Sequence, residues 1–128
     1  MTTVLLTDRA WPDDWVEREV LESAGLRLVA GGRIRPTPRR STRSWPSPSL
    51  RRILTCWAQV SATTIESCAA LKVIARMGVG LDNIDVAHAT SRGMLVTNVP
   101  DYCVEEVSDH ATIPFWCPCP RHGGEPLP

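Results

Sequence analysis

The short turn formed by Gly78, Val79 and Gly80 is the strongest candidate for chemistry in this sequence. It follows an apolar run at residues 72–77 and precedes a helix-like segment at residues 84–92. Glycine lets the backbone approach a ligand closely, and free amides near a helix N-terminus attract anions. Ligands of doubly wound sheets bind beyond the carboxyl ends of the strands. The turn therefore predicts a site for a small carboxylate or a phosphate.

Two other interpretations of the turn stay open. The dinucleotide fingerprint G-x-G-x-x-G would need a third glycine where "GVGLDN" has Asn83, so the match is two of three. The turn can also be a plain connection from a strand to a helix, with no ligand at all. The residues alone do not separate these readings.

Other side chains with chemical potential are weaker candidates. Cys117, Cys119 and His122 form C-x-C-x-x-H, which is a pattern for a soft metal. Three ligands among prolines, without a fourth or an outer shell, make a poor site, so no metal is expected. His88 and His110 are interpreted as surface or packing residues rather than general bases. No catalytic residue is assigned.

The elements that would position the turn alternate between strand and helix, which predicts an α/β fold with a parallel sheet. Strands are predicted at residues 4–8, 26–30, 53–57, 72–77 and 95–99. Helices are predicted at residues 13–24, 62–71, 84–92 and 104–111. The turn then lies at the carboxyl end of the fourth strand.

Two segments interrupt this pattern. Seven of the thirteen arginines fall between Arg33 and Arg52, among prolines and serines, so residues 31–52 are predicted to be irregular. A nucleic-acid patch is the weaker alternative there. Pro114 is expected to end the last helix, which leaves residues 112–128 as an irregular tail to a domain at residues 1–111. Two shifts of reading frame in a dehydrogenase gene would account for both segments, and a genuine short protein is the alternative.

The bulk composition excludes several classes of function. The chain has 128 residues, enough for one domain, and its 14 basic residues balance 14 acidic ones. This balance gives no reason to expect nucleic acid or an anionic membrane as a partner. The first residues lack the pattern of a secretion signal and no apolar run is long enough for a membrane span, so a cytoplasmic protein with reduced thiols is expected.

The stretch "ARMGVGLDNIDVAHATSRGMLVTNVP", followed by "EEVSDHA", resembles the D-isomer-specific 2-hydroxyacid dehydrogenases, the family of phosphoglycerate, glycerate and formate dehydrogenases. The resemblance is dense over residues 71–111. It implies a flavodoxin-like parallel sheet with helices on both faces, which is the substrate-binding domain of that family. A Rossmann domain normally lies beside it, and here that domain is missing from the sequence.

The resemblance also implies roles for particular residues. Gly78, Val79 and Gly80 match the turn whose amides hold the substrate carboxylate. Asn98 matches a residue of the interdomain cleft, and Val107 matches a residue that faces the nicotinamide.

Further expectations follow from the same resemblance. Asp82 and Asp85 match helix-start positions and are interpreted as caps. The family uses NAD on a small 2-hydroxy or 2-keto acid and often forms homodimers, whereas this chain is expected to bind no NAD.

Three functional readings follow from these observations. The first is a truncated substrate-binding domain of a 2-hydroxyacid dehydrogenase, inactive alone because the family's catalytic Arg, Glu and His are absent. The second is a non-enzymatic binding or regulatory module with the same fold. The third is a two-component enzyme that a separate nucleotide-binding chain completes. Which 2-hydroxy acid the family member uses, and whether NAD or NADP, is not decided by the sequence.

Overall fold

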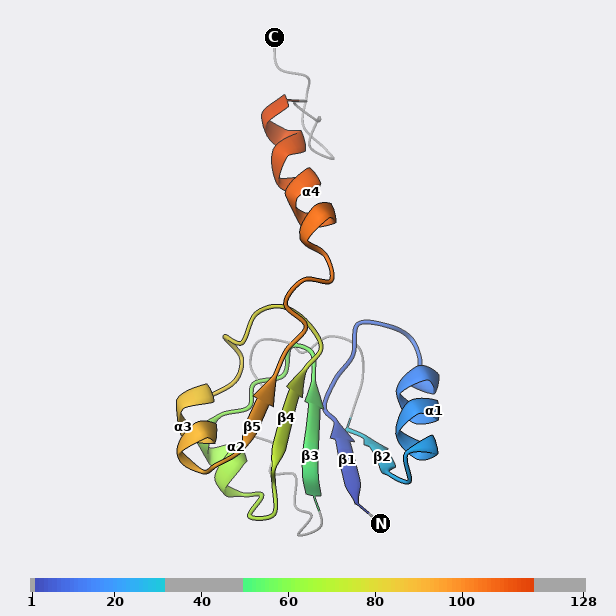
Figure 1. Cartoon of the computed structure of the whole chain (residues 1–128), viewed down its shortest axis with the longest axis vertical. Coiled ribbons are helices and arrows are strands. Elements are labelled where there is room, and N and C mark those ends of the chain that lie inside the picture. Colours follow the sequence, from blue (N-terminus) through green and yellow to red (C-terminus); the bar gives the residue numbers. More distant parts are fainter. Residues whose placement is uncertain (1, 32–49, 117–128) are drawn as a thin grey trace.

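A computed structural model describes residues 2–31 and 50–116 of the chain, with side chains described up to residue 112. Its centre is a five-stranded parallel sheet with the strand order β2-β1-β3-β4-β5 (Figure 1). The strands are β1 (Thr3–Leu6), β2 (Arg27–Ala30), β3 (Leu50–Thr55), β4 (Val73–Arg76) and β5 (Leu95–Thr97). This order is that of the flavodoxin-like sheets, so the predicted fold class is confirmed.

Every predicted helix is also present. The helices are α1 (Trp15–Ser23), α2 (Ala62–Glu66), α3 (Val86–Ser91) and α4 (Val104–Trp116). The prediction that α2 extends to residue 71 was wrong. The Leu71 amide donates to the carbonyl of Cys68 at 2.9 Å, and this turn places both side chains in the core, where they are 2% and 1% exposed.

Helices cover both faces of the sheet. Successive strand residues point to opposite faces. Accordingly, Leu5 of β1 packs into the cluster beneath α2 and α3, whereas Val4 and Leu6 pack into the cluster that includes Leu21 of α1. The larger cluster also contains Ile53, Ile65, Ile74 and Ala89, and the smaller one contains Leu28. The face beneath α2 and α3 is therefore well buried, whereas α1 covers the other face only near β2, and Leu95 of β5 is left 59% exposed.

The start of β3 corrects the predicted irregular segment at residues 31–52. Leu50 is 3% exposed, and Arg52 pairs with Val4 of β1 and Val73 of β4. Composition pointed to a loop, but two flanking strands satisfy the backbone here and the core accepts Leu50. Residues 32–49, where the rest of the predicted irregular segment falls, lie outside the described residues.

The last helix corrects the prediction for Pro114. α4 continues through Pro114 to Trp116. Proline removes one amide donor and crowds the preceding turn, but its fixed φ is compatible with helical backbone. Only two residues follow it in the helix, so little of the hydrogen-bond ladder is lost. The remaining residues of the predicted tail, 117–128, are outside the described part.

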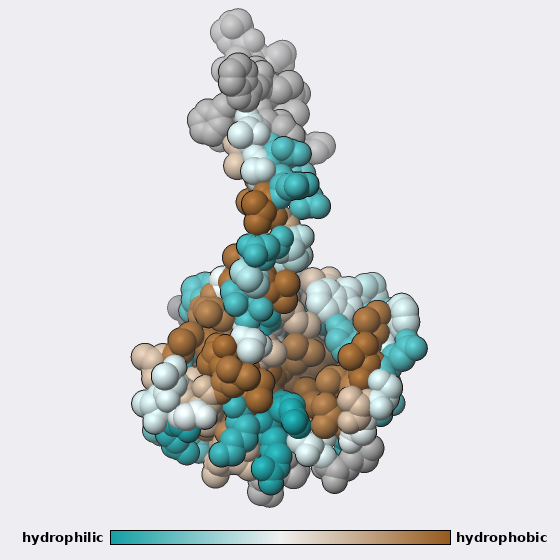
Figure 2. Space-filling view, in the orientation of Figure 1, coloured by the Kyte–Doolittle hydropathy of each residue, from teal (hydrophilic) through white to brown (hydrophobic). Residues whose placement is uncertain are grey.

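α4 projects away from the body of the molecule (Figure 1) and packs against no other element that the structure describes. Val104 and Val107 on this helix are 57% and 60% exposed. Figure 2 shows hydrophobic side chains on the helix and on the body below it. Within the described residues, no helix has the length and hydropathy needed to cross a membrane.

Candidate functional site

The glycine turn lies at the carboxyl edge of the sheet, directly after β4. Residues that follow β5 hold it in place. The Asn98 side-chain amide donates to the carbonyl of Val79 at 2.7 Å, and the Val99 amide donates to the carbonyl of Gly78 at 3.1 Å. The carbonyls of these two residues are therefore occupied. The turn's amides, at Gly78, Val79 and Gly80, donate to no described residue; Val79 and Gly80 are exposed, whereas Gly78 is buried.

Arg76, the last residue of β4, adds a positive charge to these amides. Its guanidinium packs against Gly78, at the place where a β-carbon would otherwise lie. Gly78 has φ +156°, a conformation that side chains rarely adopt. The Arg76 Nε is buried and has no hydrogen-bond partner among the described residues. A buried donor without a partner is costly, so an acceptor placed there would stabilise the protein.

Sequence reasoning missed Arg76 as a site residue. The signal was present, because an arginine ends an apolar strand immediately before a glycine turn. Together, the guanidinium and the three amides form a cationic, donor-rich site of the kind that binds a carboxylate.

Asp8 is a second residue that sequence reasoning missed. It follows β1, and its side chain is buried, with 3% exposure. Its carboxylate accepts hydrogen bonds from three consecutive amides after β3, those of Cys56 at 3.0 Å, Trp57 at 2.8 Å and Ala58 at 3.2 Å. The Thr7 hydroxyl donates to the same carboxylate at 2.7 Å.

The place that Asp8 occupies is important for ligand binding. β1 and β3 are the strands between which the winding of the sheet reverses, and this switch point is the usual ligand crevice of such folds. Here the protein's own carboxylate takes the amides at that point. The free amides lie one strand further, at the end of β4.

Cys56 lies between these two positions. It is 5% exposed, and its thiol contacts the carbonyl of Met77 at 3.7 Å. Burial raises the pKa of the Cys56 thiol and the Asp8 carboxylate raises it further, while the Arg76 guanidinium opposes both. Cys56 is therefore a poor nucleophile and is better described as a packing residue.

This assignment predicts slow alkylation of Cys56. At about pH 8, iodoacetamide should modify Cys56 roughly tenfold or more slowly than the partly buried Cys103, because a raised pKa leaves less thiolate and burial blocks access. Peptide mapping by mass spectrometry measures both rates in one sample. In urea the two rates should converge. Equal rates in the folded chain would contradict the assignment.

Tyr102 lies on the loop after β5, near the same edge. A side-chain hydrogen bond with Cys103 raises the pKa of the Tyr102 phenol, and the Arg76 guanidinium acts in the opposite direction. The ring is 63% exposed.

The structure brings together most of the predicted site residues. Asn98 contacts the turn, but as a support for the Val79 carbonyl. Val107 lies on α4 and makes no contact with the turn, so its role toward a nicotinamide stays a prediction.

The predicted capping residues have different outcomes. Asp85 is confirmed as the N-cap of α3, since its carboxylate accepts from the His88 amide at 3.0 Å. Asp82 is not the cap. Its Oδ1 lies beside Gly80 instead, 2.8 Å from where a β-carbon on that glycine would be.

The two histidines in the described part of the chain lie away from the turn. His88 Nε2 on α3 is 3.5 Å from the Glu66 carboxylate on α2. His110 Nδ1 on α4 contacts the carbonyl of Glu106 at 2.8 Å. No group of three potential metal ligands occurs within the described residues, and Cys117, Cys119 and His122 lie outside them.

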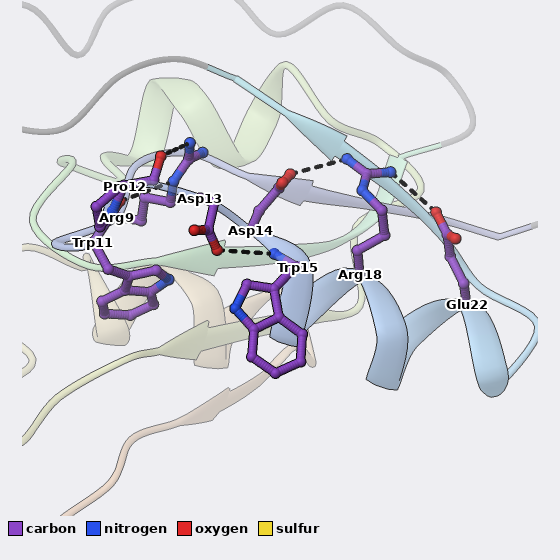
Figure 3. A network of polar contacts seen from close by, with 8 residues as sticks. All are labelled: Arg9, Trp11, Pro12, Asp13, Asp14, Trp15, Arg18 and Glu22. Carbon is purple, nitrogen blue, oxygen red and sulfur yellow. Dashed lines mark hydrogen bonds and ion pairs between the residues drawn. The ribbon is translucent and has the colours of Figure 1, made fainter.

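The polar network of side chains on α1 is structural. Arg18 bridges Asp14 at 2.9 Å and Glu22 at 3.0 Å along one face of the helix, as Figure 3 shows. Hydrogen bonds to Glu22 and then to Asp14 raise the pKa of Arg18. These partners neutralise the guanidinium, so this network is not a second anion site.

Comparison with known proteins agrees with the geometry. Residues 51–114, half of the chain, match the family model described as D-isomer specific 2-hydroxyacid dehydrogenase, catalytic domain. The chain belongs to this family.

Particular relatives and structures support the same assignment. The chain is 46% identical over 52 residues to D-3-phosphoglycerate dehydrogenase of Mycobacterium tuberculosis, an alignment that covers 41% of this chain and 10% of that protein. A Thermus thermophilus protein of known structure superposes with a TM-score of 0.71 at 24% identity, over 89% of this chain and 35% of its own. D-lactate dehydrogenase from Aquifex aeolicus, solved with NAD and lactic acid, gives a TM-score of 0.65 at 22% identity, over 88% of this chain and 32% of its own.

The chain therefore spans about a third of the length of the solved structures that it resembles, and the aligned part is a tenth of the curated relative. The structural likenesses are below 25% identity, so they support the fold rather than a particular reaction.

Proposed function

We propose that this chain forms the carboxylate-binding part of the substrate site in a D-isomer-specific 2-hydroxyacid dehydrogenase. The family interconverts 2-hydroxy acids and 2-keto acids with a nicotinamide cofactor that accepts or supplies the hydride. The observation that carries the proposal is the set of unpaired amides at Gly78, Val79 and Gly80 beside the Arg76 Nε, which has no partner among the described residues. One carboxylate oxygen would accept from the amides and the other from the guanidinium.

We propose that the glycine turn itself is not a dinucleotide site. A dinucleotide pyrophosphate needs a free helix N-terminus directly after the glycine turn. Here α3 begins at Val86, and the Asp85 carboxylate already occupies its N-cap. Asn83, which stands where the third glycine of the fingerprint would be, is 4% exposed and donates to the carbonyl of Ala58 at 2.9 Å. These contacts argue against the dinucleotide interpretation of the turn.

We further propose that the 128-residue chain binds the substrate carboxylate without turning the substrate over. Oxidation at the carbon that bears the hydroxyl requires a base for its proton and a bound hydride acceptor. Among the described residues, His88 lies on α3 with its Nε2 3.5 Å from the Glu66 carboxylate, and His110 lies on α4 with its Nδ1 against the Glu106 carbonyl; neither contacts the turn. The chain's contribution is to hold and orient the acid.

The test is a titration of the isotopically labelled chain with glyoxylate, followed by amide NMR. We expect shifts at Gly78, Val79 and Gly80. Arg76→Gln should weaken binding by about tenfold or more, because a charge-assisted hydrogen bond is lost. Arg18→Gln is the matched control, since that arginine is already paired with Asp14 and Glu22.

Cofactor addition completes the test. NADH alone should leave these amides unshifted, and NADH with glyoxylate should give no turnover. Glyoxylate binding that is indifferent to Arg76→Gln would overturn the carboxylate site. Saturable NADH binding that shifts the glycine turn would revive the dinucleotide interpretation.

A further inference from the structure

The residues around the carboxylate site bear on the rest of the substrate. β3 and β4 are paired neighbours, with Thr55 opposite Arg76, and the Met77 amide donates to the carbonyl of Thr55 at 2.8 Å. Their carboxyl ends therefore lie side by side. Trp57, two residues beyond the end of β3, is thus next to the segment that leads into the glycine turn.

The backbone of Trp57 is held by a hydrogen bond, whereas the residue remains partly exposed to solvent. Its amide donates to the buried Asp8 carboxylate at 2.8 Å, yet 43% of the residue is exposed. Val79 within the turn is 44% exposed, and Tyr102 is 63% exposed. A rigid backbone with exposed aromatic and aliphatic side chains is typical of a surface that receives an apolar group.

The charges of the three loops that follow β3, β4 and β5 point the same way. The Arg76 guanidinium packs against Gly78 of the turn. Arg9, on the loop after β1, donates hydrogen bonds to the carbonyls of Trp11 at 3.0 Å and Pro12 at 2.8 Å. The loops after β3, β4 and β5, at residues 56–61, 77–85 and 98–103, contain no lysine or arginine. The second of these loops carries Asp82, whose carboxylate lies beside Gly80. A second anionic group on the substrate would meet a carboxylate and no free cation within these loops.

We infer that this site takes a 2-keto or 2-hydroxy acid with an apolar, preferably aromatic, side chain that packs against Trp57 and Val79, rather than a phosphorylated acid. The inference rests on the proposed function, because it needs the carboxylate to be held at the glycine turn. The inferred substrate preference differs from that of the relative named as a phosphoglycerate dehydrogenase, although both proteins belong to the same family.

Three acids test the inference by NMR titration of the full chain: glyoxylate, which has no side chain, phenylpyruvate, and 3-phosphohydroxypyruvate. Phenylpyruvate should bind about tenfold more tightly than glyoxylate, which is the discrimination that an apolar pocket provides. The phosphorylated acid should bind no more tightly than glyoxylate. Trp57→Ala should remove most of the advantage of phenylpyruvate and leave glyoxylate binding within about twofold, because only the apolar contact is lost.

Trp15→Ala is the matched control, since Trp15 is 62% exposed but lies on α1, which packs beside β2 at the other side of the sheet. It should change none of the three affinities. If the phosphorylated acid binds most tightly, or Trp57→Ala weakens all three acids equally, the inference is overturned while the carboxylate site stands. If none of the acids shifts the glycine turn, the proposed function is overturned, and the inference with it.

Discussion

Replacing Asp8 by alanine should lower the free energy of unfolding by about 3 kcal/mol or more, since it leaves the amides of Cys56, Trp57 and Ala58 buried or part-buried without an acceptor. Domains of this size have margins of only about 5–15 kcal/mol, so the loss is a large share of the total. Urea unfolding followed by circular dichroism measures it. Asp8→Asn should be intermediate between the unsubstituted chain and Asp8→Ala, because it keeps one acceptor oxygen and turns an amide toward the other donors.

Asp14→Ala is the control for this prediction. Asp14 also carries a carboxylate beside the start of an element, but it pairs with Arg18 at the surface and makes no side-chain cap bond with α1. Exposed ion pairs contribute little to stability, so unfolding should barely change. If Asp8→Ala costs no more than Asp14→Ala, the carboxylate is not the support of the loop after β3.

Gly78→Ala is expected to abolish detectable binding of glyoxylate. Its β-carbon would occupy the position of the Arg76 guanidinium, and the backbone at φ +156° disfavours any side chain, at a cost of about 1–3 kcal/mol. The arginine would be displaced and the amides of the turn would move with the strained backbone. Amide NMR measures binding, and thermal unfolding measures the cost in stability.

Gly93→Ala separates these two effects. Gly93 also has a positive φ, +68°, but a β-carbon there would meet nothing within 4 Å. We expect a loss of stability from the backbone alone, with binding of glyoxylate unchanged. Retained binding in Gly78→Ala, at a stability equal to that of Gly93→Ala, would show that the guanidinium does not need its place beside the glycine.

The strands and helices could be predicted because their apolar periodicity is local and the core accepts it. The errors occurred where tertiary partners override composition. Leu50 to Arg52 belong to an arginine-rich stretch, yet β1 and β4 provide hydrogen-bond partners on both sides and so extend the strand. The turn at residues 68–71 ends α2 early, because it buries Cys68 and Leu71 together.

Only some of the site residues could likewise be predicted from the sequence. The residues of the glycine turn are contiguous, so the turn could be recognised from the sequence. Asp8 was not, because its partners are 48–50 residues away and meet it only through the pairing of β1 with β3. From the sequence alone, Arg76 resembles any residue at the end of a strand. Its role depends on Gly78, because the guanidinium lies where a β-carbon on that residue would be.

Among the elements that the structure describes, α4 packs against none, and this affects how the chain folds. A solitary helix of 13 residues is at the lower limit of what persists in water, because nucleation is costly and few hydrogen bonds offset it. Glu105 and Glu106 in its first turn favour the helix through its dipole, but only slightly. We therefore expect the sheet with α1, α2 and α3 to unfold as one cooperative unit and α4 to follow its own helix–coil equilibrium. A far-UV signal from this chain should accordingly contain a gradual component that does not follow the melting of the core.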